Sequence, residues 1–473
     1  MADITRTFDI ADQRWFAAAS GDFNPLHVDL QWAAAHFPGA LVVHGQHVLL
    51  WTLDQLALLR PNDHFASIAA TYLKPVIVGD QVELSFSEAG AVARVTVRRE
   101  IVMVARIEFG ESRGGGDGRF QAGPSPAAAR ARPVSEFAGL TGAVAMPDLA
   151  TEIAMRFPAL ASIIGADRVI GLAAISTLVG MDCPGLRSML SRLAVTVADA
   201  EGAGSVAYQV RKFHEAMSLV EIDFSGLGIA GTVSAFTGPE PAAPPSDEAI
   251  RALVSPTEFR GQRPLIVGAS SGLGAATARL LAAGGADPVL TWHASNADAT
   301  VKTVQAFGAT GQSLRLDATS PSQGLADLAA TGWQGGQLYY FAAPRIFRRR
   351  IELYNEQDFR DFTSVFVDGF HRIVDALASM KSGPLTIFYP SSVAVEESAT
   401  DLLEYAMAKT IGERLCARME QKIDGLKIVV IRLPRIATRQ TETFLKVKSD
   451  PPEAAMLPII RAVQSTGTGR ANP

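Results

Sequence analysis

The chain has 473 residues, 48% of them hydrophobic and 19% charged, with a formal net charge of −5. This length suggests about three domains of ordinary size, and the charge balance gives no electrostatic case for binding nucleic acid or an anionic membrane. Two cysteines, Cys183 and Cys416, argue against a disulfide framework. Because no apolar run reaches the ~18 residues of a membrane span and the N-terminus lacks the features of a signal peptide, we expect a multidomain cytoplasmic enzyme that does not bind a membrane.

The first chemically informative stretch is Ser20-Gly21-Asp22-Phe23-Asn24-Pro25-Leu26-His27. Asn-Pro favours a turn, so Asp22 and His27 should flank a loop and not share a helix face. A carboxylate and an imidazole that point into one pocket can divide acid and base catalysis. His44-Gly45 follows, before a predicted helix from Gln46 to Leu59 whose first N–H groups could bind a developing oxyanion.

These segments, with Tyr72-Leu73-Lys74-Pro75-Val76 and Gly79-Asp80, resemble the MaoC-like dehydratases, which include the (R)-specific enoyl-CoA hydratases. The resemblance implies a hotdog fold over residues 1–112 and the addition or removal of water across the C2–C3 bond of an acyl thioester. It further implies that Asp22 and His27 are the catalytic pair and that the Gly45 N–H binds the thioester carbonyl. Taken singly, Asp22 could cap a helix and His27 could be an ordinary loop histidine.

Residues 113–144 are predicted to be a linker, because a run of glycines is followed by an Ala/Pro/Arg-rich stretch from Pro124 to Pro133. Its arginines are interpreted as part of a solvated tether. A helical pattern from Arg168 to Met181 then precedes four predicted strands, and no acid–imidazole turn is present.

The interpretation is that residues 145–237 form a second, degenerate hotdog. In that interpretation Ile170-Gly171 corresponds to His44-Gly45. We therefore expect an α+β double hotdog whose first half holds the chemistry and whose second half shapes the acyl tunnel.

A second predicted linker, residues 238–260, leads to an α/β pattern over residues 261–473. Leu265 to Val267 reads as a buried parallel strand, and a glycine-rich turn, a helix and a second strand follow. This order places backbone N–H groups at the pyrophosphate of a dinucleotide in a Rossmann domain with a doubly wound parallel sheet. The residues predicted to bind it are Gly268, Ser270, Ser271, Gly272, Leu273 and Gly274.

Residues 261 to 440 resemble the short-chain dehydrogenase/reductase family. Asp317 matches the family's adenine-contacting strand end, Ser392 ends an apolar strand, and Tyr405-Ala406-Met407-Ala408-Lys409 matches its Tyr-x-x-x-Lys helix. Residues four apart share a helix face, so the Lys409 ammonium can favour the phenolate and lower the Tyr405 pKa. The resemblance implies that Tyr405 protonates the alkoxide, Ser392 holds its oxygen and Lys409 also contacts the nicotinamide ribose.

Three departures from that family leave open an inactive, nucleotide-binding domain. Phe341-Ala342-Ala343-Pro344 stands where the family has Asn-Ala-Gly, and Pro434-Arg435 stands where it has Pro-Gly. The position of the family's catalytic asparagine falls at Phe366, which would interrupt a water relay behind Lys409.

The cofactor is predicted to be NADPH, because the second strand ends at Thr291 to Ser295 without an acid. An acid there would favour NAD, whereas a neutral or partly cationic end that includes His293 fits a 2′-phosphate. No metal site is predicted. Arg345 and Arg348 to Arg350 could bind the phosphates of CoA or of a carrier's phosphopantetheine, or could belong to a solvated loop.

Together these features predict a bifunctional enzyme of fatty-acid or polyketide type metabolism. It would reduce a 3-oxoacyl thioester of CoA or acyl carrier protein and dehydrate the 3-hydroxyacyl product, or hydrate in reverse, as a homodimer. One alternative keeps the dehydratase and makes the Rossmann domain a non-catalytic binding or docking module. The other is a non-enzymatic scaffold with both sites degenerate.

Overall fold

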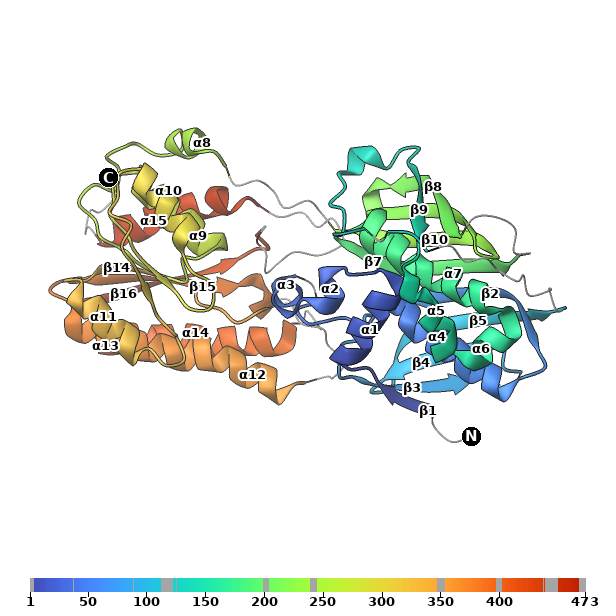
Figure 1. The fold of residues 1–473 in the computed structure, drawn as a ribbon. Coiled ribbons are helices and arrows are strands. Elements are labelled where there is room, and N and C mark those ends of the chain that lie inside the picture. Colours follow the sequence, from blue (N-terminus) through green and yellow to red (C-terminus); the bar gives the residue numbers. More distant parts are fainter. Residues whose placement is uncertain are drawn as a thin grey trace. The chain divides into compact units, whose positions relative to one another are not determined.

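The computed structural model describes residues 4–36, 38–87, 89–111, 122–124, 126–198, 204–238, 245–346, 354–396, 402–436, 438 and 450–467. These residues form two compact units, one up to residue 238 and the other from residue 245 (Figure 1). The glycine-rich part of the first predicted linker, residues 239–244 of the second, and Arg348 to Arg350 lie outside the described residues.

The N-terminal unit contains a ten-stranded antiparallel sheet with the order β1-β3-β4-β5-β2-β7-β10-β9-β8-β6. Buried and exposed residues alternate along β3 and β4, because side chains of a strand point to opposite faces. Pairing of β2 with β7 joins two five-stranded halves into one sheet. The strands are β1 Ile4–Thr7, β2 His64–Tyr72, β3 Gln81–Phe86, β4 Val92–Val97, β5 Glu100–Gly110, β6 Thr141–Ala145, β7 Ser188–Val197, β8 Ser205–His214, β9 Leu219–Gly226 and β10 Ile229–Thr237.

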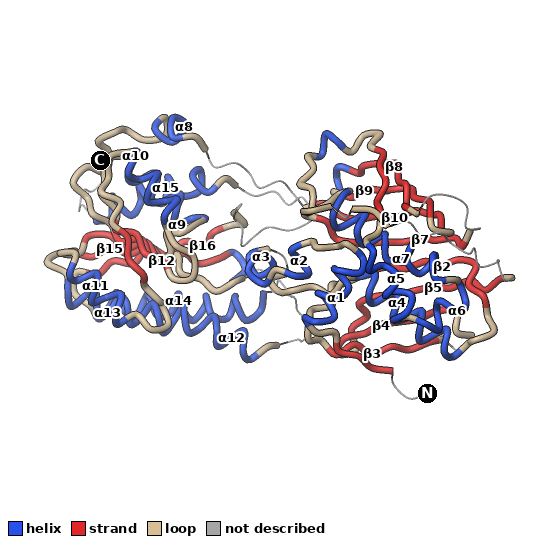
Figure 2. Tube along the Cα trace, viewed as in Figure 1, coloured by secondary structure: helices blue, strands red, loops and turns tan. Residues whose placement is uncertain are grey.

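Two apolar helices, α4 and α7, form the core of this unit. Apolar side chains surround most of each helix, and such helices are stable only when they are buried on nearly all sides. Figure 2 shows them among the other helices of the unit. The helices are α1 Ile10–Ser20, α2 Pro25–Val28, α3 Leu30–Ala35, α4 Gly45–Leu59, η1 Val134–Glu136, η2 Asp148–Ala150, α5 Thr151–Arg156, α6 Pro158–Ile164, α7 Ala166–Thr177, η3 Leu178–Asp182 and η4 Glu215–Met217.

The structure differs from the predicted second half in two places. The end of the predicted linker 113–144 forms β6, where Val144 is buried at the sheet edge. The correspondence of Ile170-Gly171 with His44-Gly45 was wrong, since α7 begins at Ala166 and Gly171 lies inside it. A Cβ at Gly171 would lie 3.1 Å from the side chain of Leu227, so this glycine permits close packing of the helix on the sheet.

The arginines of the predicted solvated tether are anchored. Arg132 donates from Nε to the Asp182 carbonyl and from Nη2 to the Asp182 carboxylate at 2.6 Å, and Arg130 lies 2.8 Å from the same carboxylate. Tyr208 also donates to it at 2.8 Å. A buried carboxylate needs such partners. Arg132 and Asp182 lie 50 residues apart in the chain, so no local sequence pattern predicts that they pair.

The C-terminal unit contains a six-stranded parallel sheet with the order β13-β12-β11-β14-β15-β16. Counted along the chain this is the 3-2-1-4-5-6 order of a doubly wound Rossmann fold, which confirms the predicted fold of this part. The strands are β11 Leu265–Val267, β12 Val289–Trp292, β13 Ser313–Arg315, β14 Gly336–Tyr340, β15 Leu385–Ser392 and β16 Leu426–Leu433.

Helices cover both faces of this sheet (Figure 1). One apolar core lies under α8 Asp247–Arg251, α9 Gly272–Ala283, α10 Asp298–Ala306 and α15 Pro452–Gly467. The other lies under α11 Ser322–Ala330, α13 Phe370–Met380 and α14 Leu403–Lys422. The remaining helical segments are α12 Glu356–Thr363, η5 Ser364–Gly369 and η6 Val393–Val395. Within the predicted linker 238–260, α8 buries Ile250 in the first of these cores.

Among the described residues, no single helix has both the length and the apolar character needed to cross a membrane. The segments Pro158–Ile164 and Ala166–Asp182 meet that test only when joined, and they are bent by 112° at their junction.

Candidate active sites

The acid–imidazole loop is shaped by helix ends. α1 ends at Gly21, and Asn24 caps α2 by accepting a hydrogen bond from the Leu26 N–H at 3.1 Å, with Pro25 as the first helical residue. Asp22 therefore lies between the helices, as predicted, while His27 lies on the short helix α2. The carboxylate of Asp22 and the rings of His27 and His44 bring one oxygen or nitrogen atom each within 4.8 Å of one another.

Asp22 is buried, with 1% of its surface exposed. Its Oδ1 accepts a hydrogen bond from the Asn24 N–H at 3.1 Å, and its Oδ2 accepts one from the Ser176 hydroxyl at 2.6 Å. Burial raises the pKa of this carboxyl, and the neighbouring His27 and the two hydrogen bonds oppose that rise. A raised pKa lets this carboxyl keep its proton to a higher pH than an ordinary aspartate, as a general acid requires.

His27 donates from Nδ1 to the Val42 carbonyl, with 2.7 Å between nitrogen and oxygen. A carbonyl can only accept, so Nδ1 carries the proton and Nε2 is left as the basic nitrogen. In the part of the chain that the structure describes, Nε2 of His27 has no hydrogen-bond partner.

The His27 ring stacks on His44, with 3.9 Å between their centres. His44 Nδ1 lies 3.0 Å from Oε1 of Gln13, and Nε2 lies 3.0 Å from the Asp22 carbonyl. Burial and the neighbouring His27 lower the pKa of His44 well below its usual range, so the ring is neutral. His44 thus packs against the His27 ring and contacts the loop that carries Asp22. A neutral ring has one N–H, so it donates to only one of these two oxygens.

The N-terminus of α4 meets this pair. His44 is the N-cap residue, and within the described residues the N–H groups of Gly45 and Gln46 have no hydrogen-bond partner. A Cβ at Gly45 would lie 3.0 Å from the Tyr72 ring, whose buried hydroxyl also has no partner in the described chain. Free N–H groups at a helix start are suited to an oxyanion, which is the role predicted for Gly45.

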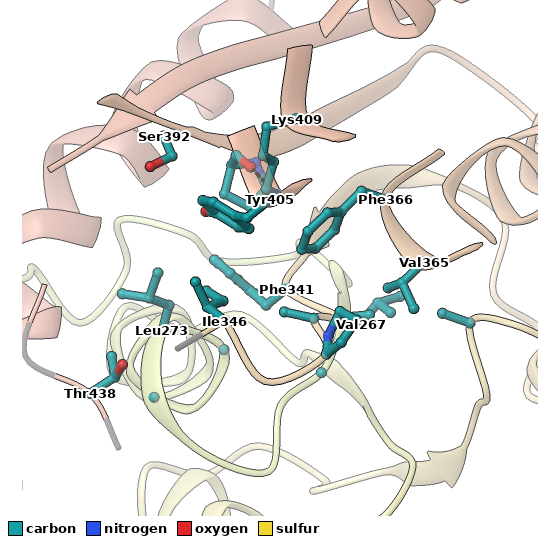
Figure 3. Close-up of a pocket in the computed structure, with 18 of the residues that line it drawn as sticks. Val267, Leu273, Phe341, Ile346, Val365, Phe366, Ser392, Tyr405, Lys409 and Thr438 are labelled. Carbon is teal, nitrogen blue, oxygen red and sulfur yellow. Dashed lines mark hydrogen bonds between the residues drawn. The ribbon is translucent and has the colours of Figure 1, made fainter. Parts of the chain in front are cut away.

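The second site is a cavity of about 800 Å³ in the Rossmann unit, beyond the carboxyl ends of the strands (Figure 3). All the residues predicted to bind the dinucleotide line it, as do Ser392, Tyr405 and Lys409. A Cβ at Gly274 would lie 2.1 Å from the Gly268 carbonyl oxygen, so only glycine allows α9 to start this close to β11. The cavity volume and the glycine turn before α9 fit a dinucleotide with its pyrophosphate at the helix start.

His293 and Asp317 form one edge of this cavity, at the ends of β12 and β13. His293 Nε2 lies 3.3 Å from Oδ2 of Asp317, and half of the histidine side chain is exposed. The β12 end carries an imidazole and no carboxylate of its own, which is the arrangement predicted to accept a 2′-phosphate.

Ser392 ends β15, and Tyr405 and Lys409 lie one turn apart on α14. Figure 3 shows Tyr405 and Lys409 beside Phe366. Burial raises the pKa of Tyr405 to about 12, opposed by a hydrogen bond from Ser392, and burial lowers the pKa of Lys409 to about 7. The expected lowering of the tyrosine pKa is therefore contradicted, because desolvation outweighs an ammonium 5.9 Å from the ring centre.

Phe366 lies in the π-helical turn η5. The wider turn frees backbone carbonyls, and two buried tyrosines donate to them: Tyr340 to Val365 at 2.7 Å and Tyr389 to Phe366 at 3.0 Å. The Phe366 ring faces the Lys409 ammonium, which donates to the Pro390 carbonyl at 2.6 Å. Phe366 thus contacts Lys409 directly, and the expected interruption of a water relay there stays a prediction.

The structure thus places a carboxyl group and two imidazoles together in an antiparallel α+β unit, and a glycine-lined cavity in a Rossmann unit. Residues 2–109 match the family described as MaoC like domain, so the N-terminal part of the chain is a MaoC-like domain. No curated protein matches the chain.

Several solved structures are similar to the chain. A protein from Pseudomonas syringae assigned to the short chain dehydrogenases is 22% identical, with a TM-score of 0.41, over 46% of this chain and 94% of its own. An acetoin dehydrogenase from Salmonella typhimurium is 20% identical, with a TM-score of 0.38, over 43% of this chain and 89% of its own. A short-chain dehydrogenase/reductase from Serratia marcescens is 18% identical, with a TM-score of 0.39, over 44% of this chain and 91% of its own.

Sequence reasoning missed the residues that hold the acid–base pair. Gln13, His44 and Ser176 contact Asp22 or the ring that stacks on His27, yet no role was assigned to them. His44 could have been found from its place beside Gly45, but no signal in the sequence relates Ser176 to Asp22.

Proposed function

We propose that the C-terminal unit reduces a 3-oxoacyl thioester with NADPH and that the N-terminal unit dehydrates the 3-hydroxyacyl product, or hydrates the enoyl thioester in reverse. The observation that carries this proposal is the gathering of Asp22 and His27 at the free N-terminus of α4. The two reactions are consecutive because reduction creates the hydroxyl that dehydration removes.

In dehydration, Nε2 of His27 would accept the C2 proton, and Asp22, whose pKa is raised by burial, would give its proton to the C3 hydroxyl. The C2–C3 double bond forms as the C3–O bond breaks, and water leaves. The Gly45 N–H would stabilise the charge that develops on the thioester oxygen. Proton transfer from His27 back to Asp22 would restore the pair.

In reduction, Tyr405 would protonate the oxygen of the 3-oxo group and Ser392 would hold that oxygen. A dinucleotide, when bound, supplies the hydride. The residues proposed to hold it are the glycine-rich turn, His293, Asp317 and Lys409, all of which line the cavity. A polar wall built from Ser392 and Tyr405 next to an 800 Å³ cavity supports this assignment.

The proposed architecture of the N-terminal unit is a double hotdog, with residues 145–237 as a degenerate copy. Each five-stranded half of the sheet has one buried apolar helix, α4 or α7, which supports that interpretation. The proposed substrates are thioesters of CoA or acyl carrier protein, and the proposed assembly is a homodimer.

The test is mass spectrometry of the products from a panel of 3-oxoacyl thioesters with NADPH. We expect NADPH oxidation and an enoyl product. The Tyr405→Phe variant should no longer oxidise NADPH but should still dehydrate a supplied 3-hydroxyacyl thioester. The Asp22→Asn variant should still oxidise NADPH but should not dehydrate that thioester. Absence of both reactions across chain lengths, with CoA and with carrier protein, would contradict the proposal.

A second candidate keeps only the dehydratase and makes the Rossmann unit a nucleotide-binding module. It is favoured by Lys409, whose ammonium donates to the Pro390 carbonyl and faces the Phe366 ring. NADPH binding without turnover, unchanged by Tyr405→Phe, would support this candidate over the bifunctional enzyme.

A further inference from the structure

One helical segment from the second half of the N-terminal unit, α7 with η3, contacts the loop that carries Asp22. Thr177 donates from its hydroxyl to the Ser20 carbonyl at 2.5 Å, and the Gly180 carbonyl accepts from Nδ2 of Asn24 at 2.8 Å. Between them, Ser176 donates to the Asp22 carboxylate at 2.6 Å. Three contacts thus clamp the loop that carries the acid, and one of them ends on the acid itself.

The segment is shaped to let this carboxylate approach. α7 passes into a π-helical turn over Leu178–Asp182, and Gly180 lies in that turn. A Cβ at Gly180 would lie 2.4 Å from Oδ1 of Asp22, well inside contact distance, so any side chain there would push the carboxylate away. Ser176 and Gly180 therefore contact the two oxygens of Asp22 from the same helical segment.

We propose that Ser176 is a positioning residue for Asp22, holding Oδ2 and so fixing the orientation from which this carboxyl gives its proton. The second half of the unit then contributes a polar group to the site and does more than shape a tunnel. This inference rests on the proposed dehydratase function, because it assigns Ser176 to the same acid.

The chemistry follows from what a hydroxyl donor does to a carboxyl group. A donated hydrogen bond stabilises the ionised form, which Asp22 reaches once it has given its proton to the leaving hydroxyl. The same bond opposes the rise in the Asp22 pKa that burial causes. Loss of the hydroxyl should therefore raise the pKa of Asp22 further and slow the step in which this carboxyl ionises.

The first test compares Ser176→Ala with Ser188→Ala in dehydration. Ser188 is also buried and donates to the Val179 carbonyl at 2.8 Å, so its variant loosens the same turn without touching a carboxylate. We expect Ser176→Ala to lower kcat about tenfold at nearly constant KM, since a hydrogen bond to a charged group contributes about that factor. The limb of the pH–rate profile that Asp22 governs should move to higher pH, whereas Ser188→Ala should leave it in place.

The second test needs no activity. Thermal midpoints are measured against pH for Ser176→Ala, for Asp22→Asn and for the double variant. Since the raised pKa of Asp22 makes its ionisation destabilising as pH rises, Asp22→Asn should stabilise the unit near neutral pH, and more so in the Ser176→Ala background. The proposal would be overturned if the changes in thermal midpoint caused by the two substitutions simply added in the double variant. It would also be overturned if the pH–rate profile of Ser176→Ala superimposed on that of the wild type. If the wild-type chain were inactive but the midpoint changes were not additive, only the dehydratase function would be overturned.

Discussion

The ammonium nitrogen of Lys409 lies 3.8 Å from the centre of the Phe366 ring. Cation–π attraction partly replaces the water that a buried ammonium loses, and the Pro390 carbonyl provides one hydrogen bond. These two contacts hold the ammonium of Lys409 in place, but a phenyl ring cannot bind the water of a proton relay.

Phe366→Asn is therefore expected to raise the rate of carbonyl reduction. An amide at this position can bind water and connect Lys409 to solvent, and we expect kcat to rise about tenfold, within the range that proton-transfer catalysis can supply. Stopped-flow measurement of NADPH oxidation checks this. Phe366→Leu is the control, since it removes the ring without offering a polar atom and should give no increase; equal rates for both variants would count against the relay.

We expect the buried ammonium of Lys409 to lower the stability of the C-terminal unit. Burial lowers its pKa from 10.5 to about 7, so between these two pH values the unfolded chain binds a proton that the folded chain does not. Lys409→Met should then raise the thermal midpoint by about 3 °C or more at pH 7, and the gain should shrink as the pH rises toward 10.5. Lys422→Met, an exposed change on the same helix, should leave the midpoint unchanged at every pH. A gain independent of pH would show that the ammonium is not the cause.

Part of the fold could be predicted from local sequence patterns. The strand, glycine turn and helix that start at Leu265 predicted the Rossmann unit. The four strands predicted after the helical pattern from Arg168 to Met181 correspond to β7 to β10. β1 and β6 were missed because both are short edge strands with few buried residues, for which the periodic signal is weak.

The residues that surround the sites were harder to predict. Asp22 and His27 could be proposed because they lie five residues apart in a recognisable motif. The Ser176 hydroxyl bonds a carboxylate 154 residues earlier in the chain, and the Asp182 carboxylate is paired with arginines about fifty residues away. Such contacts depend on how α7 packs across the sheet. The lowered tyrosine pKa was also wrong, because the depth of burial of Tyr405 cannot be read from a four-residue spacing.

Cofactor preference offers a test that does not depend on turnover. An acid at the end of β12 would accept a hydrogen bond from a ribose 2′-hydroxyl and repel a 2′-phosphate. His293→Asp should therefore weaken NADPH binding at least about tenfold and tighten NADH binding, as measured by fluorescence titration of each dinucleotide. His293→Gln keeps a neutral polar group and should change the ratio of the two affinities much less. Tighter binding of NADH than of NADPH by the wild-type chain would show that the proposed preference is wrong.

The carboxylate of Asp182 is expected to be a major source of stability in the N-terminal unit. It is 7% exposed and pairs with Arg132, which is 11% exposed, while Tyr208 donates to its other oxygen. Asp182→Ala would remove the carboxylate that accepts from Nη2 of Arg132 and from the Tyr208 hydroxyl, so we expect the free energy of unfolding to fall by roughly 3 kcal/mol. Glu136→Ala removes the half-exposed second partner of the same arginine and should cost less than about 1 kcal/mol. Calorimetry of both variants checks the difference, and equal losses would mean that burial of the Asp182 pair does not set its strength.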